Sequence, residues 1–95
     1  MVVVEEVKIE QMIHRKLGMR FSAEKFFESL NNNAEEIIID FTNVDFMSRS
    51  FAQEYVFQKR KTDVKIVEKN TKGIVKDMLS TVEKDYNNTF GLAIS

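Results

Sequence analysis

Hydrophobic and polar residues follow two spacings along the chain, and their order predicts the fold. In the segment 3–13 the apolar side chains recur at odd positions, which is the two-residue period of a half-exposed strand or hairpin. The run 37–39 is uninterrupted isoleucine and favours a central strand covered on both faces. Two further strands are predicted, a short one from Val64, Ile66 and Val67 and a last one at the sheet edge from the alternation of Phe90, Leu92 and Ile94.

Three other segments have the 3.6-residue period of amphipathic helices. The first opens at Phe21 and Ser22, where we expect Ser22 to cap the helix and Phe21 to pack on Phe26 as a hydrophobic staple. The second helix is predicted over 48–60 and the third over 71–86. The residues expected on the buried faces are Ala23, Phe26, Phe27 and Leu30, then Phe51, Ala52, Tyr55 and Val56, then Ile74, Val75, Met78, Leu79, Val82 and Tyr86.

Strands that alternate with helices predict parallel pairing through right-handed crossovers, in one domain that spans residues 1–95. Functional sites of such sheets lie where the carboxyl ends of strands meet the starts of helices. The segment 39–52 is the richest such junction in this chain, because it combines carboxylates, hydroxyls and an arginine.

Composition excludes several classes of function. The chain has 95 residues, no Cys and a single His, so disulfide frameworks, thiolate nucleophiles, zinc fingers and multi-histidine metal centres lack their side chains. A formal net charge of -1 argues against nucleic-acid binding. The N-terminus has no signal-peptide pattern, and no apolar run approaches the length of a membrane-spanning helix, so we expect a cytoplasmic protein without a membrane segment.

The junction sequence IIIDFTNVDFMSRSFAQEY resembles the strand, loop and helix start of STAS domains, the fold of bacterial anti-sigma-factor antagonists. It is more similar to the STAS-like domain family of unknown function, through Asp40-Phe41, the helix start at 50–52 and the upstream Gly18-Met19-Arg20-Phe21. The resemblance implies a small α/β, STAS-like domain. Such a domain has a mixed, mostly parallel sheet of about four strands with about three helices.

In STAS antagonists the loop carries an Asp-Ser-Ser-Gly type motif whose first Ser is phosphorylated by a partner kinase. On this chain the motif's Asp falls on Ser48, its phosphoacceptor on Arg49, its second Ser on Ser50 and its Gly on Phe51. The usual acceptor is therefore missing, and Ser50 or Ser48 is the candidate substitute. The resemblance implies a histidine-kinase-like ATPase or a sigma-factor regulator as the class of partner.

The side chains of the junction also have simpler interpretations. Ser48 or Ser50 can be the N-cap of the second helix, and Ser50 with Gln53 matches a capping box. Asp40 and Asp45 are expected to organise the loop by hydrogen bonding. Helical geometry places Phe57 opposite the buried arc of the second helix, where it either packs on a neighbouring helix or anchors a partner.

We therefore expect a non-enzymatic signalling or adaptor domain that binds a protein partner through the loop 42–49 and the exposed face of the helix 48–60, without metal or cofactor. The predicted partner-binding residues are Ser48, Arg49, Ser50, Gln53, Glu54 and Phe57. Two alternatives stay open. One is a small Mg-dependent phosphotransfer or hydrolytic enzyme that uses Asp40, Asp45 and Ser50, and the other is a purely structural homodimer.

Overall fold

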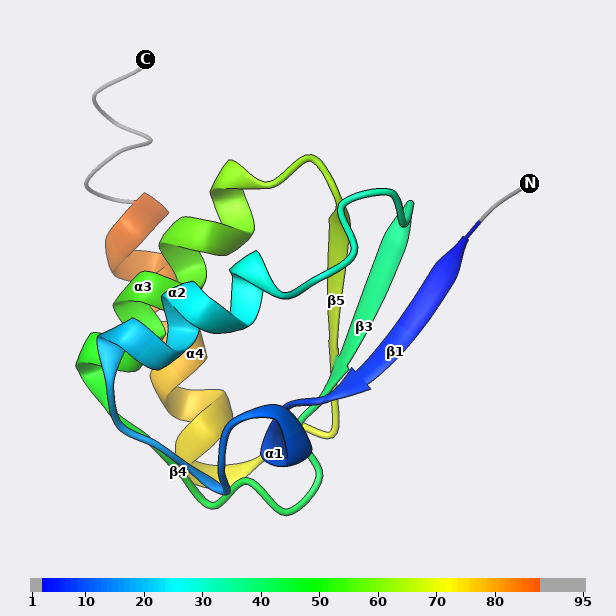
Figure 1. Cartoon of the computed structure of the whole chain (residues 1–95). Helices are drawn as coiled ribbons and strands as arrows, with labels where there is room; N and C mark the ends of the chain where they lie inside the picture. The colour runs from blue at the N-terminus through cyan, green and yellow to red at the C-terminus, as the bar shows by residue number, and fades with distance from the viewer. Residues whose placement is uncertain (1–2, 88–95) are drawn as a thin grey trace.

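The computed structural model describes residues 3–87, so the strand predicted at 90–94 lies outside the described residues. Figure 1 shows the arrangement of the elements. In chain order they are β1 (Val4–Lys8), α1 (Ile9–Met12), β2 (Lys16–Leu17), α2 (Arg20–Glu28), β3 (Glu36–Asp40), β4 (Phe46–Met47), α3 (Arg49–Lys61), β5 (Lys65–Lys69) and α4 (Gly73–Tyr86). Within 3–87, no helix has the length and apolar character that crossing a membrane requires.

The main sheet has the order β1-β3-β5, and both of its pairings are parallel. The helices α2, α3 and α4 all lie on one side of it (Figure 1). A second, two-stranded parallel sheet pairs β2 with β4, and the sequence pattern did not predict it. The result is a small α/β fold of two layers, in which the α/β class expected from the sequence is confirmed.

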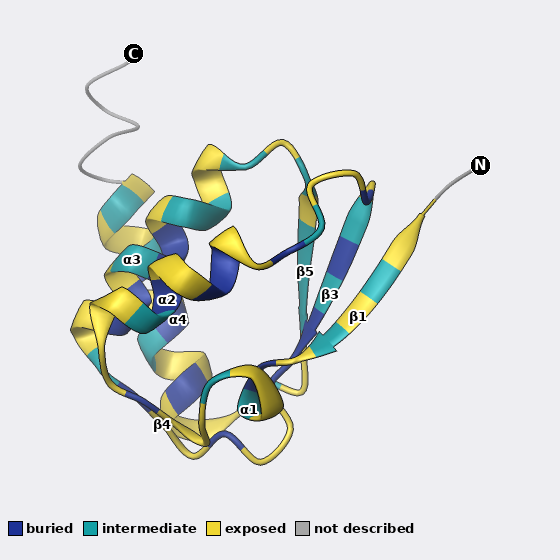
Figure 2. Cartoon of the chain, viewed as in Figure 1, coloured by how far each residue is buried: buried dark blue, intermediate teal, exposed yellow. Residues whose placement is uncertain are grey.

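The isoleucine run forms the central strand, as predicted, but the prediction that both of its faces are covered is wrong. Ile37 and Ile39 are 1% and 0% exposed, whereas Ile38 is only half-buried. Figure 2 shows this alternation of buried and half-buried stretches along β3. Successive side chains of a strand point to opposite faces, and none of the helices within residues 3–87 lies on the outer one.

The outer face of the sheet is largely charged. Lys69 Nζ lies 3.0 Å from a carboxylate oxygen of Glu6, and Lys65 Nζ lies 3.5 Å from one of Glu36. The ion pair between Lys69 and Glu6 raises the pKa of Lys69. Cross-strand pairs of opposite charge suit a solvent-facing sheet, which explains how a parallel sheet tolerates one open face here.

Tyr55 of α3 is the centre of the core. It is fully buried, and its ring lies 5.3 Å from that of Phe27 on α2 and 5.9 Å from that of Phe41 after β3, both edge-on. Phe51 stacks on the same ring at 6.3 Å. Aromatic pairs at such distances add to the stabilisation from apolar burial, so one side chain ties α3 to both α2 and the sheet.

The Tyr55 hydroxyl donates a hydrogen bond of 2.7 Å to Glu68 of β5. Glu68 also accepts from Lys59 at 3.1 Å, and Lys59 donates to Glu83 of α4 at 3.0 Å. Burial, followed by the charge of Glu68, raises the pKa of the Tyr55 hydroxyl well above its usual value. This chain of bonds joins α3, β5 and α4 beneath the sheet.

Three predictions about the ends and faces of elements are wrong. The helix predicted from Ser22 begins at Arg20, and its N-cap, Met19, makes no side-chain capping bond. Phe21 is exposed, with Lys25 Nζ 5.2 Å from the centre of its ring, so it does not form a staple with Phe26. Ile74, expected on the buried arc of the last helix, is exposed.

The N-terminal strand is also shorter than its alternating pattern, because β1 ends at Lys8 and Ile9 begins the single helical turn of α1. Ile9 is fully buried there. A buried apolar residue at position 9 fits the alternation of a strand and equally the first turn of a helix, so the pattern alone did not distinguish the two structures.

Because only one face of the sheet is buried, alanine substitutions at neighbouring residues of β3 should lower the free energy of unfolding by different amounts. Ile39→Ala should lower the free energy of unfolding by about 2–5 kcal/mol, because it opens a cavity in the core. Ile38→Ala removes the same atoms from a half-buried position and should cost about 1 kcal/mol. Urea unfolding of both variants measures the difference, and equal losses would mean that the outer face is covered.

Candidate functional site

The site is built at the carboxyl end of β3, where Asp40 holds the following loop in place. Asp40 Oδ1 accepts hydrogen bonds from the Thr42 backbone N–H at 2.9 Å, the Thr42 hydroxyl at 2.6 Å and the Asn70 side-chain amide at 2.9 Å. The hydrogen bonds from Asn70 and Thr42 lower the pKa of Asp40 to about 2. Asp40 therefore organises the loop, as the sequence indicated, and joins the ends of β3 and β5.

The middle of the loop is fixed to the segment before α2. A turn closes with the Val44 N–H donating to the Phe41 carbonyl at 3.0 Å, and Asn43 in this turn has a φ of 67°, which Asn tolerates better than most residues. Asp45 accepts from the Arg15 guanidinium at 3.0 Å, and its N–H donates to the Arg15 carbonyl at 3.0 Å. The predicted structural role of Asp45 thus has a partner, Arg15.

Ser48 connects the loop to α3. Its hydroxyl oxygen accepts from the Phe51 N–H at 3.1 Å, which makes Ser48 the N-cap, and the same hydroxyl donates to the Gly18 carbonyl at 2.8 Å. The capping box expected from Ser50 and Gln53 is therefore wrong. The bond to Gly18 also joins two stretches that carry the sequence resemblance, one before α2 and one at the start of α3.

Of the predicted partner-binding residues, the structure places Ser50, Gln53 and Phe57 together. All three are exposed, and at about 100° per residue they fall on the side of α3 opposite its buried residues. We call these three residues the α3 stripe. Phe57 is 45% exposed, and Lys61 Nζ lies 5.8 Å from the centre of its ring.

The other members of the predicted set have partners within the fold. Arg49 points toward α4, where its guanidinium lies 2.7 Å from an Asp85 carboxylate oxygen. Glu54 is half-buried and accepts a 2.8 Å hydrogen bond from Gln58. Of the two candidate phosphoacceptors, Ser50 is exposed at the second position of α3, whereas the Ser48 hydroxyl is occupied by the cap and by Gly18.

Sequence reasoning missed a set of exposed apolar side chains near the carboxyl ends of the strands. They are Met12, Met19, Phe21, Phe46 and Ile74. Met19 and Phe46 lie beside the start of α3, because the β2–β4 pairing and the Ser48–Gly18 bond hold their segments there. Phe21 was predicted to pack on Phe26 as a staple and Ile74 to lie on a buried arc, since the sequence pattern does not show which apolar residues are left uncovered.

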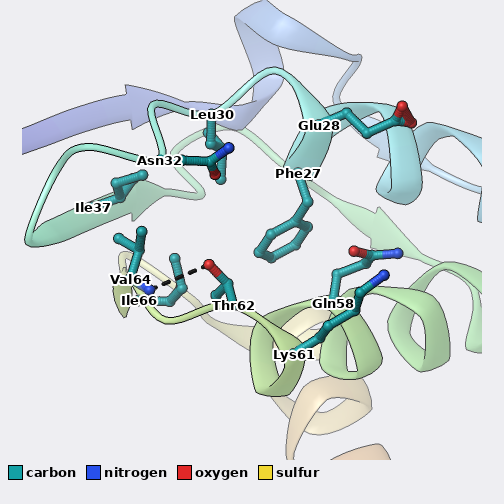
Figure 3. Close-up of a pocket in the computed structure, with 10 residues that line it drawn as sticks. All are labelled: Phe27, Glu28, Leu30, Asn32, Ile37, Gln58, Lys61, Thr62, Val64 and Ile66. Atoms are coloured by element: carbon teal, nitrogen blue, oxygen red, sulfur yellow. Dashed lines mark hydrogen bonds between the residues drawn. The ribbon is translucent and has the colours of Figure 1, made fainter.

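A separate cavity of about 190 Å³ lies at the opposite, amino end of the strands (Figure 3). Its lining combines apolar side chains, among them Phe27 of α2 and Ile37 of β3, with polar ones such as Gln58 and Thr62. No residue of the α3 stripe lines it. The cavity and the loop site are therefore distinct features.

A comparison with protein families matches the part of the chain that contains this loop and α3. The profile described as "STAS-like domain of unknown function (DUF4325)" matches residues 22–71, more than half of the chain. The chain belongs to this STAS-like family. The match runs from α2 to just beyond β5, so it contains the loop, the Ser48 cap and the α3 stripe.

Comparisons of this STAS-like chain with curated proteins and with solved structures gave no match. Arg49, on which the sequence resemblance laid the STAS phosphoacceptor, is the first residue of α3 and is paired with Asp85. The family membership thus identifies the fold, and the side chains of the site have to be interpreted from their own contacts.

The lowered pKa of Asp40 predicts a pH-dependent stability. Because the folded pKa lies below the ordinary 3.8, the carboxylate stabilises the fold fully above pH 3.8 and loses this contribution as the pH falls toward 2. Asp40→Asn should therefore lower the free energy of unfolding by about 1–2 kcal/mol at pH 7, and its difference from the wild type should become smaller as the pH falls from 5 to 2. Urea unfolding of both proteins over this pH range measures the difference.

Asp45→Asn serves as the control, since its exposed ion pair with Arg15 should be worth less than about 1 kcal/mol. A pH-independent gap for Asp40→Asn would contradict the assigned role of Asp40.

The two serines at the start of α3 should behave differently. Ser48→Ala removes the N-cap and the bond to Gly18 and should lower the free energy of unfolding by about 1–2 kcal/mol. Ser50→Ala, at an exposed position, should change it by less than about 0.5 kcal/mol. Thermal and urea unfolding of the pair compare them, and the reverse order would place the cap at Ser50.

Proposed function

We propose that this STAS-like domain is a non-enzymatic signalling or adaptor module of the cytoplasm. It binds a protein partner through the α3 stripe and the adjacent loop 42–49. The single observation that carries this proposal is the exposure of Phe57 on the outer side of a helix whose start is fixed by the Ser48 cap. Desolvated aromatic side chains supply much of the energy of protein interfaces, so an exposed Phe on a rigid helix is a suitable anchor.

The rigidity of the loop supports binding in a defined geometry. Three attachments hold it: Asp40 at its start, Asp45 in its middle and Ser48 at its end. A surface that is already ordered loses little conformational entropy when a partner binds. Phe46 and Met19 add apolar surface beside the start of α3.

Binding is a better account of these groups than catalysis. Asp40 is buried and accepts three hydrogen bonds at one oxygen, and Asp45 is paired with Arg15. Among the side chains of residues 3–87, no group of three or more His, Cys, Asp and Glu is arranged to hold a metal ion. The Mg-dependent alternative would need these carboxylates to leave their partners and converge.

Ser50 is the residue at which we propose regulation. It is exposed at the second position of α3, where a negative charge is favourable because the helix dipole places partial positive charge at this end. A phosphate on Ser50 would leave the fold intact while it changes the charge of the α3 stripe. From the family resemblance, the partner class we propose is a histidine-kinase-like ATPase or a sigma-factor regulator.

Two variants test the α3 stripe. The tagged chain is used as bait to capture its partner from the native cytosol, and the affinity of each variant for the purified partner is then measured. Phe57→Ala should weaken binding by tenfold or more, equivalent to about 1.4 kcal/mol, and Ser50→Glu should weaken it while the fold is preserved. Intact-mass measurement of the bait shows whether Ser50 carries phosphate.

Phe21→Ala is the matched control, because Phe21 is an exposed aromatic on a different helix that borders the groove between α1 and α2. It should retain the partner. Unchanged binding of both stripe variants would exclude this surface. Light scattering measures the mass in solution. A mass of two chains for the wild type and of one chain for Phe57→Ala would instead favour the structural homodimer.

A further inference from the structure

The inner face of the main sheet is covered unevenly by the helices. Ile37 of β3 and Ile66 of β5 are cross-strand neighbours on this face, yet Ile37 is 1% exposed and Ile66 is only half-buried. Toward the carboxyl end of the strands, the Tyr55 ring and its aromatic neighbours fill the space beneath the helices. At the amino end, the cavity of about 190 Å³ remains between α2 and the turn from α3 to β5 (Figure 3).

The apolar walls of this cavity suit the body of a small ligand. They are formed by Phe27, Leu30, Ile37, Val64 and Ile66. Figure 3 shows the ring of Phe27 pointing away from α2 and into the space that the other lining residues surround. Voids larger than a water molecule are few in close-packed proteins, and a cavity of about 150 Å³ with similar walls holds benzene in another protein. The volume here therefore suits one branched or aromatic group with a small polar part.

Two side chains of opposite charge, Glu28 and Lys61, also line the cavity. Within residues 3–87, neither of them forms an ion pair. Glu28 is the last residue of α2, where the helix dipole places partial negative charge and a carboxylate is unfavourable. A cationic group of a ligand at this position would compensate both the carboxylate and the end of the helix.

Lys61 differs from the other two cations in the last turn of α3. Lys59 is paired with two glutamates and Arg60 donates to a side-chain amide, whereas Lys61 has no acidic partner among the described residues. The hydroxyl oxygen of the next residue, Thr62, accepts a hydrogen bond from the Val64 N–H at 3.2 Å, so its own O–H remains available as a donor. Both residues line the cavity, and an ammonium with a hydroxyl donor suits a ligand carboxylate.

We infer that the cavity binds a free α-amino acid whose apolar side chain is about the size of that of leucine. Its ammonium group pairs with Glu28, its carboxylate pairs with Lys61 and the Thr62 hydroxyl, and its side chain contacts the apolar walls. A zwitterion supplies both charges in one molecule, whereas an apolar acid or an apolar amine leaves one of the two lining charges unpaired. The inference goes beyond the proposed partner surface, because no residue of the α3 stripe lines the cavity.

NMR titration of the full chain with three probes tests the inference. Leucine has both charges, isocaproate lacks the ammonium group and isoamylamine lacks the carboxylate, while all three share the same branched apolar end. Leucine should shift the methyl signals of Ile37, Val64 and Ile66 until they saturate at millimolar concentrations. Each truncated probe should bind about two to five times more weakly than leucine, which is the contribution of one ion pair near the protein surface.

Variants without one of the two charges assign the contacts. Glu28→Gln should lower the affinity for leucine to that for isocaproate, and Lys61→Gln should lower it to that for isoamylamine. Both side chains are exposed, so both variants should keep the fold. Glu24→Gln is the matched control, because it removes an exposed carboxylate of α2 that does not line the cavity, and it should leave all three affinities unchanged.

Three results would overturn the inference. If leucine causes no saturable shifts at the lining residues, the cavity does not bind an amino acid. Equal affinities for the three probes would show that neither charge takes part in binding. NOEs from another segment of the chain to Phe27 or Val64 in the ligand-free protein would show that the chain itself fills the cavity.

Discussion

The buried ring and hydroxyl of Tyr55 are the interaction on which the rest of the structure depends. The ring contacts aromatic side chains from α2, from the end of β3 and from α3 itself, and the hydroxyl reaches Glu68 of β5. A polar tip in an apolar core is stable only when it is hydrogen-bonded, and Glu68 provides that partner while Lys59 balances its charge. Tyr55 thereby fixes the rotation of α3 about its axis.

The rotation of α3 determines which residues face solvent. With Tyr55 inside, Phe57 is two residues away and falls on the outer side, in line with Ser50 and Gln53. The same geometry turns Arg49 toward Asp85 of α4, while Glu54 accepts a hydrogen bond from Gln58 one turn further along α3 itself. The core thus selects the composition of the α3 stripe, which has one aromatic, one amide and one hydroxyl side chain.

The sequence predicted much of this arrangement, and its errors have physical causes. The order of the main elements, the central isoleucine strand and the loop role of Asp40 follow from local patterns, and the structure confirms them. The open outer face could not be read from the isoleucine run, because its ion pairs depend on strand pairing: Lys69 of β5 meets Glu6 of β1, and Lys65 of β5 meets Glu36 of β3. The N-cap was ambiguous between Ser48 and Ser50 until the contact with Gly18 was seen.

The β2–β4 pairing is the clearest example of a tertiary constraint. Each strand has two residues, too few for any periodic signal, and the contact between Arg15 and Asp45 that accompanies the pairing joins residues 30 positions apart. The exposed position of Ile74 has the same kind of cause, because only the packing of α4 on α3 decides which flank of its apolar arc is covered.

Site-specific photo-crosslinking tests the central claim, that the partner docks on the outer side of α3, most directly. A photoreactive phenylalanine analogue replaces Phe57 in one chain and Ile38, on the open face of the sheet, in another, and each is irradiated with the purified partner. A covalent adduct is expected from position 57 and none from position 38. An adduct from position 38 alone would contradict this claim and move the docking surface to the sheet.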